Sequence, residues 1–116
     1  MKNKNFDTLG LMIDMSRNSV MSLDGLKRFI PLLEKMGYNM LMLYTEDTYE
    51  VDGEPYFGYM RGKYTKDEMK EIDAFAESHG ITVIPCIQTL AHLEALVRWK
   101  TYPTDGGCVM MVDDPR

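Results

Sequence analysis

Three short apolar runs alternate with two amphipathic stretches along this chain. The apolar runs cover residues 9–14, 40–44 and 81–87, and their length and composition are typical of strands buried on both faces. Apolar residues recur at helical spacing over 23–36 and 66–79, which predicts a helix in each range. Farther along, the pattern predicts a short helix over 91–99 and an extended piece over 109–112.

Local signals mark where the two longer helices begin and end. Ser22 is a residue type that caps helices, and Gly37 is suited to the left-handed turn after the first helix. Thr65 and Glu68 have the spacing of a capping box before the second helix, which is expected to end before Gly80. The apolar stripes predicted to face the core comprise Leu23, Leu26, Phe29, Ile30, Leu33, Met36, Met69, Ile72, Phe75 and Ala76.

The links after the helices are short, whereas those after the strands are longer, and this order predicts parallel strands joined by right-handed crossovers. We therefore predict an α/β fold in which about three parallel β/α units form part of a (β/α)8 TIM barrel. The 116 residues would form one domain, well short of the roughly 250 that a closed barrel needs. A doubly wound open sheet is the alternative, although no glycine-rich phosphate turn follows the first strand.

The composition narrows the partners that the chain can have. A net charge of −5 and a pI near 4.9 argue against a nucleic-acid partner, because phosphate binding needs a basic face. Neither a secretory leader nor an apolar run of membrane-spanning length is visible, which favours a cytoplasmic protein with no membrane partner. Cys86 and Cys108 are too few for a disulfide framework or a zinc site, and we expect no cofactor.

Polar residues gather where each predicted strand ends, and parallel strands place these ends on one rim. They are Asp14, Ser16, Arg17, Thr45, Glu46, Asp47, Gln88, Thr89 and His92. Such a rim suits a polar substrate, although each side chain could instead cap the following helix. A carboxylate from Glu46 or Asp47 could orient His92 and raise its pKa. A metal site built from His92, Glu94 and the pair Glu46 and Asp47 would have too few ligand-bearing strands to be convincing.

The link after the second strand is long, acidic and aromatic. Residues 46–54 hold five acids and no base, and residues 44–64 hold six of the twelve aromatic residues of the chain. Unusually long links of this kind tend to be functional. Carboxylates can bind sugar hydroxyls and aromatic rings can pack on a pyranose, which favours a carbohydrate site. The alternative is a solvated acidic loop whose aromatic residues pack on its own helix.

Residues 9–17, 39–47 and 84–92 carry three motifs that together resemble glycoside hydrolase family 20, the β-N-acetylhexosaminidases. Residues 9–17, Leu-Gly-Leu-Met-Ile-Asp-Met-Ser-Arg, resemble the first barrel strand of that family. Residues 39–47 are similar to its second strand, which ends in an acidic pair, and residues 84–92 are similar to its third, which ends with a histidine. The resemblance covers nearly the whole chain and identifies residues 1–116 as the N-terminal part of such a catalytic barrel.

The resemblance implies a retaining hydrolase of glycans that end in N-acetylglucosamine or N-acetylgalactosamine. The nucleophile would be the 2-acetamido oxygen of the substrate, and an Asp-Glu pair after the fourth strand would orient it and supply the acid/base group. Glu46 or Asp47 would support that glutamate through His92. Residues expected to bind substrate are Asp14, Arg17, Tyr44, Tyr56, Tyr59 and Gln88.

Two departures from the family pattern shape the expected behaviour of these 116 residues. Leu9 stands where many members have a sugar-binding arginine, and no fourth strand with Asp-Glu is present, so we expect the chain alone to be inactive. Open strand edges and apolar side chains without barrel partners predict self-association; these side chains are Met12, Met42, Ile84 and Ile87. A self-associating scaffold and a non-catalytic carbohydrate-binding module are the competing interpretations.

Overall fold

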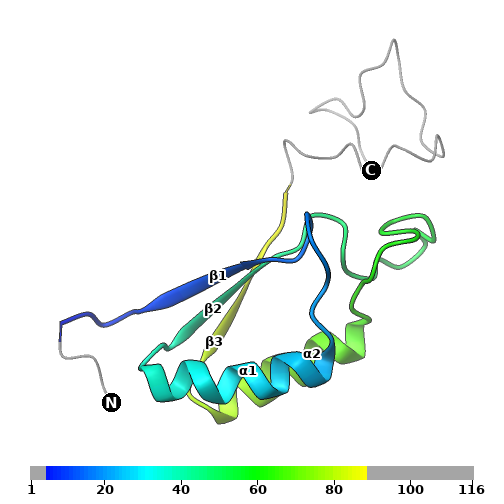
Figure 1. Cartoon of the computed structure of the whole chain (residues 1–116). Helices are drawn as coiled ribbons and strands as arrows, with labels where there is room; N and C mark the ends of the chain where they lie inside the picture. Colours follow the sequence, from blue (N-terminus) through cyan, green and yellow to red (C-terminus); the bar gives the residue numbers. More distant parts are fainter. Residues whose placement is uncertain (1–4, 89–116) are drawn as a thin grey trace.

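The computed structural model describes residues 5–88, which form three strands and two helices in the predicted order (Figure 1). Strand β1 spans Gly10–Asp14, helix α1 Leu23–Met36, strand β2 Met40–Tyr44, helix α2 Lys66–Ser78 and strand β3 Thr82–Cys86. These bounds lie within a residue of the predicted ones. The helix predicted over 91–99 and the extended piece over 109–112 lie outside the described residues.

The strands form one parallel sheet in the order β1-β2-β3. Met12, Met42 and Ile84 lie side by side in register across it. Both helices cover the same face of the sheet (Figure 1). Consecutive parallel strands with both crossover helices on one face are the arrangement expected of successive β/α units in a barrel.

The caps read from the sequence are all present. The Ser22 side chain accepts a hydrogen bond from the Gly25 N–H, and Gly37 adopts a φ of 87° after α1. Thr65 and Glu68 form the complete capping box at the start of α2. Ser22 and Thr65 accept hydrogen bonds from unpaired N–H groups at the helix starts, and the Gly37 N–H donates to the Glu34 carbonyl at the end of α1, which is why local sequence alone locates these ends.

The core lies between the sheet and the two helices. Leu41 and Leu43 of β2 are fully buried against Leu26, Ile30 and Leu33 of α1 and against α2. A buried leucine contributes about 1.5–3 kcal/mol, so this layer holds the unit together. Neither described helix combines the length and apolar character needed to cross a bilayer.

Burial on both faces of the sheet, and burial of Met36, were wrong predictions. Met36 is 58% exposed at the end of α1, and Met12 in β1 is 52% exposed. The helices cover only one face, and side chains that alternate along a strand point to opposite faces, so Met12 faces away from the core. Met42 and Ile84 share that face in register and are partly buried.

The link between β2 and α2 closes at its base. Tyr49 and Tyr64 form an isolated parallel bridge, and the Glu50 N–H donates to the Tyr64 carbonyl at 2.9 Å. The Tyr64 N–H donates in turn to the Thr48 carbonyl at 3.1 Å. The two ends of the link therefore lie side by side, beside the carboxyl ends of the strands (Figure 1).

Candidate active site

Polar side chains meet where β1 and β2 end. Asp14 and Tyr44 are register partners at the last position of their strands. Arg17 reaches back, with its Nη1 2.9 Å from Asp14 Oδ2 and its guanidinium carbon 5.5 Å from the centre of the Tyr44 ring. A cation over an aromatic face is attracted by the ring electrons, so Arg17 joins the two strand ends.

Two further side chains complete this group. Gln88, two residues after β3, donates from Nε2 to the Tyr44 hydroxyl at 2.9 Å. That hydroxyl donates to Glu46 Oε1 at 3.3 Å, and the same oxygen lies 3.9 Å from Arg17 Nη2. We call the residues joined in this way the rim cluster: Asp14, Arg17, Tyr44, Glu46 and Gln88. All five were predicted site residues, and they come from all three strand ends.

Glu46 reaches the cluster because of an unusual backbone conformation. Its φ is 43°, in the left-handed region that residues other than glycine rarely occupy. The turn is held by the Thr48 N–H and hydroxyl, which donate to the Thr45 carbonyl at 2.7 and 2.8 Å. The Glu46 side chain is 12% exposed, so its carboxylate faces the cluster from a largely enclosed position.

Hydrogen bonds keep Asp14 ionised. The Ser16 hydroxyl donates to Asp14 Oδ1 at 2.7 Å, the Ser16 N–H at 2.9 Å and the Arg17 N–H at 3.1 Å. The Ser16 hydroxyl foremost, with the Ser16 amide and Arg17, holds the pKa of Asp14 well below its usual range. Asp14 in turn raises the pKa of Arg17. The cluster therefore presents a carboxylate and a guanidinium whose charges are fixed at neutral pH.

Asp47 is turned away from the rim cluster. Its side chain is 5% exposed and accepts a hydrogen bond from Arg61 Nη1 at 2.5 Å. Arg61 Nη2 donates to the Ser16 carbonyl, so one guanidinium ties the link after β2 to the turn after β1. The sequence left Glu46 and Asp47 as alternatives, and in the structure only Glu46 faces the cluster.

The remaining predicted residues divide into two groups. Tyr56 and Tyr59 lie in the link and pack against each other with ring centroids 5.5 Å apart, and the contacts described above do not include them. His92 lies outside the described residues, so its contact with either acid stays a prediction. Residues 5–88 contain no group of three or more ligating side chains able to hold a metal ion.

Comparison with known proteins identifies the family of this chain. Residues 6–111 match the model described as "Glycosyl hydrolase family 20, catalytic domain". The chain belongs to glycosyl hydrolase family 20. A curated β-hexosaminidase from Akkermansia muciniphila is 31% identical over 105 residues, covering 75% of this chain and 21% of that relative. The family 20 chain thus spans about a fifth of the length of its curated relative.

Solved structures of family 20 enzymes share the fold. The exo-β-N-acetylglucosaminidase of Vibrio harveyi, solved with N-acetylglucosamine, has a TM-score of 0.74 and 26% identity, covering 81% of this chain and 18% of that one. The N-acetyl-β-hexosaminidase of Streptomyces plicatus, solved with thio-NAglucal, has a TM-score of 0.71 and 28% identity, covering 80% and 21%. The predicted family and fold class are therefore confirmed.

Arg61 is the residue of this family 20 chain that sequence reasoning missed. The available signal was indirect: a run of five acids without a base, followed by Arg61 at the end of the same link. A carboxylate that becomes buried needs an opposite charge, and Arg61 is the guanidinium nearest in sequence to the acidic run on that side. Because the link folds back on itself, a residue 14 positions away becomes that partner.

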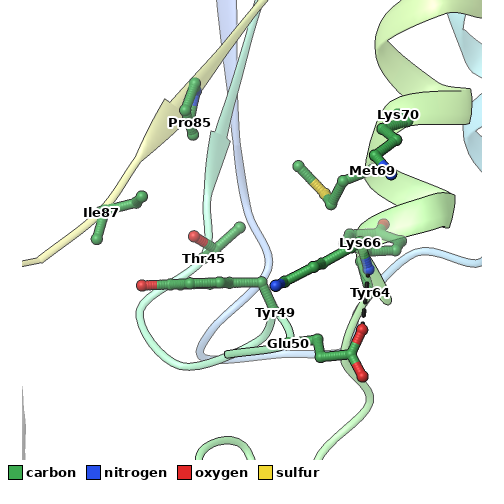
Figure 2. A pocket seen from close by; sticks show the side chains of 9 residues that line it. All are labelled: Thr45, Tyr49, Glu50, Tyr64, Lys66, Met69, Lys70, Pro85 and Ile87. Atoms are coloured by element: carbon green, nitrogen blue, oxygen red, sulfur yellow. Dashed lines mark hydrogen bonds between the residues drawn. The ribbon is translucent and has the colours of Figure 1, made fainter. Parts of the chain in front are cut away.

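A separate apolar cavity lies between α2, β3 and the link (Figure 2). Its volume is about 310 Å³, and Pro85, Ile87, Met69 and Tyr49 are among the residues that line it. Thr45 Oγ1 is buried there without a hydrogen-bond partner among the described residues. The rim cluster does not line this cavity, which sits on the helical side of the sheet.

Proposed function

We propose that this chain forms part of the substrate site of a β-N-acetylhexosaminidase. That enzyme would release terminal N-acetylglucosamine or N-acetylgalactosamine from glycans by a substrate-assisted retaining mechanism. The observation that carries the proposal is the rim cluster, in which three strand ends bring two carboxylates, a guanidinium, a phenol and an amide together. Family membership supplies the reaction class, and the relatives named above carry such activities in their names.

The charges of the rim cluster suggest which role each of its residues would have in binding the substrate. Asp14 accepts and Arg17 donates hydrogen bonds with fixed charge, which suits the hydroxyl groups of a sugar. Tyr44 and Gln88, joined by their own hydrogen bond, would present a phenol and an amide side by side to the hydroxyl groups of the sugar. Glu46, the acid that faces the cluster, would orient His92 and so support an acid/base glutamate. Asp47 would have the structural role of anchoring the link.

The reaction would then proceed in two displacements. The acetamido oxygen attacks the anomeric carbon while the glycosidic bond breaks, and the leaving oxygen takes a proton from the acid/base glutamate. Water, deprotonated by the same glutamate, then opens the cyclic intermediate and returns the product with retained configuration. Neither step uses a group assigned to residues 5–88, so these residues bind and orient the substrate.

A binding experiment on the 116-residue chain tests the proposed site. N-acetylglucosamine titrated by NMR should shift resonances of the rim cluster, and Arg17→Ala should weaken binding roughly tenfold, as expected for a lost charged hydrogen bond. Arg28→Ala is the matched control, because Arg28 pairs with Asp24 on the exposed surface of α1. An equal loss of affinity in both variants, or no binding by the wild type, would refute the assignment.

Self-association of the isolated chain is a second proposal with its own observation. Met12 is 52% and Ile87 48% exposed, and β1 and β3 are the edge strands of the described sheet. Unpaired edges and apolar surface favour pairing between copies. Light scattering should show an oligomer, and a chromogenic N-acetylglucosaminide assay on the same sample should show no turnover. A monodisperse monomer would contradict the first expectation, and turnover the second.

A further inference from the structure

Arg61 joins the two turns that carry the carboxylates of the rim cluster. Its Nη1 lies 2.5 Å from Asp47 Oδ1, and its Nη2 donates to the Ser16 carbonyl. Ser16 is also the residue whose hydroxyl and N–H donate to Asp14. Asp47, on the other side, directly follows Glu46 in the chain. One guanidinium therefore connects the two acids of the cluster through a single neighbour of each.

Two residues with a strained backbone stand next to the two ends of this ion pair. Among the residues other than glycine within 5–88, a positive φ occurs at Glu46, with 43°, and at Met60, with 58°. Glu46 precedes Asp47, and Met60 precedes Arg61. Such conformations are unfavourable for residues that have a side chain, and they persist where the surrounding contacts hold them. The ion pair between Arg61 and Asp47 is a contact adjacent to both strained positions.

The backbone of Asp47 is held as well as its side chain. A Cβ added at Gly58 would lie 2.3 Å from the Asp47 carbonyl oxygen, so the two backbones are in close contact. The Gly58 carbonyl in turn accepts a hydrogen bond from the Arg61 N–H at 3.1 Å. The Asp47 side chain is 5% exposed and that of Arg61 21%. Enclosed charged hydrogen bonds are weakened less by water than exposed ones, so these contacts fix the direction in which the chain leaves Glu46.

We infer that Arg61 is a positioning residue of the substrate site, which sets the separation between the carboxylates of Asp14 and Glu46. This inference rests on the proposed function and adds to it a residue that acts through the neighbours of both acids. Arg17 spans the same two carboxylates within the cluster, with nitrogen atoms 2.9 Å from Asp14 and 3.9 Å from Glu46. A sugar that binds to both acids needs them at one separation, so a change in it should weaken binding even when every side chain of the cluster is present.

This role depends on the forked shape of the guanidinium and not on its charge alone. Two nitrogen atoms of Arg61 have separate acceptors, Asp47 and Ser16. A lysine carries the same charge on one nitrogen, so it can neutralise Asp47 but cannot fix the separation of the two acceptors. An asparagine in place of Asp47 does the reverse, because its carbonyl oxygen still accepts a hydrogen bond from the fork while the negative charge is lost. Arg61→Lys and Asp47→Asn therefore separate position from charge.

The test titrates N-acetylglucosamine by NMR into the wild type and into both variants of the 116-residue chain. Arg61→Lys should weaken binding roughly tenfold, whereas Asp47→Asn should weaken it only about twofold. Arg28→Lys is the matched control and should bind like the wild type, because Arg28 pairs with Asp24 on the exposed surface of α1. Equal or reversed losses in the first two variants would overturn the inference. Unfolding of Arg61→Lys, seen by circular dichroism, would overturn it as well, since the role of Arg61 would then be structural.

A second measurement does not need the sugar. The Ser16 hydroxyl is the foremost cause of the low pKa of Asp14, and Arg61 holds Ser16 through its carbonyl. Carboxyl NMR should therefore show a raised pKa of Asp14 in Arg61→Lys, and an unchanged pKa there would overturn the inference.

The two measurements together separate the positioning role from the proposed function. If the wild type did not bind the sugar but the pKa of Asp14 rose in Arg61→Lys and not in Asp47→Asn, the proposed function would fail and the positioning role would stand. Equal sugar binding by the wild type and Arg61→Lys would overturn the positioning role and leave the proposed function intact.

Discussion

Replacement of Arg61 by alanine should destabilise the chain more than the loss of any exposed ion pair. Arg61 is the partner of Asp47, whose side chain is only 5% exposed, and it also donates to the Ser16 carbonyl. Arg61→Ala would leave a carboxylate buried without an opposite charge. Removing one member of a buried pair in this way costs about 3–5 kcal/mol, most of it the desolvation of the charge left behind.

The size of the effect can be measured by urea unfolding followed by far-ultraviolet circular dichroism. With a slope of about 1–3 kcal/mol per molar urea, the midpoint should fall by roughly 2 M, or the variant should be unfolded in buffer. Arg28→Ala is the control, because the Arg28–Asp24 pair has side chains 79% and 72% exposed and should contribute less than about 1 kcal/mol.

A double variant separates charge from packing. Arg61→Gln with Asp47→Asn removes both charges and keeps groups able to form hydrogen bonds, so it should recover much of the stability that Arg61→Ala loses. If Arg61→Ala shifted the midpoint no more than Arg28→Ala, Asp47 would have another counter-charge or access to water. In that case Asp47 could face the rim cluster as well as Glu46.

Two further changes test the link and its anchor. Gly58→Ala should destabilise the chain by about 1–3 kcal/mol more than Gly53→Ala in thermal unfolding. Both glycines have a positive φ, but only Gly58 lies against Asp47, so equal melting temperatures would contradict that contact. Burial foremost, and then the charge of Glu68, raises the pKa of Tyr64 from about 10 to about 12. The protonated Tyr64 hydroxyl therefore makes its full contribution to folding stability below pH 10, and this contribution is lost as pH rises through 12. The stability difference between wild type and Tyr64→Phe should therefore fall by about 2–3 kcal/mol from pH 9 to 12, and a pH-independent difference would refute the shift.

The sequence predicted those parts of the fold that local residues determine. Ser22, Gly37 and Thr65 mark helix ends because each satisfies backbone groups within three or four positions of itself. The strand ends were also predictable, since apolar runs stop where polar residues begin. Exposure of Met36 was missed because the pattern shows that a face is apolar, not whether another element of the same chain covers it.

The candidate site was predictable in its membership and not in its geometry. Asp14, Arg17, Tyr44 and Gln88 follow from strand ends and parallel topology. The choice between Glu46 and Asp47 depends on a left-handed φ at Glu46 and on a guanidinium 14 residues after Asp47. Neither has a local signature, because both result from the way the link folds back on the turn after β1.

The bridge between Tyr49 and Tyr64 has a consequence for how such proteins can diversify. Because the two ends of the link meet there, the distance between the end of β2 and the start of α2 is set at the base and not by the residues between. Lengthening a closed loop adds only a small entropic penalty, about 0.6 kcal/mol for each doubling. Insertions or deletions within 51–56, ahead of the Gly58 and Arg61 contacts, would therefore alter the surface offered to a ligand while the barrel strands and helices keep their spacing.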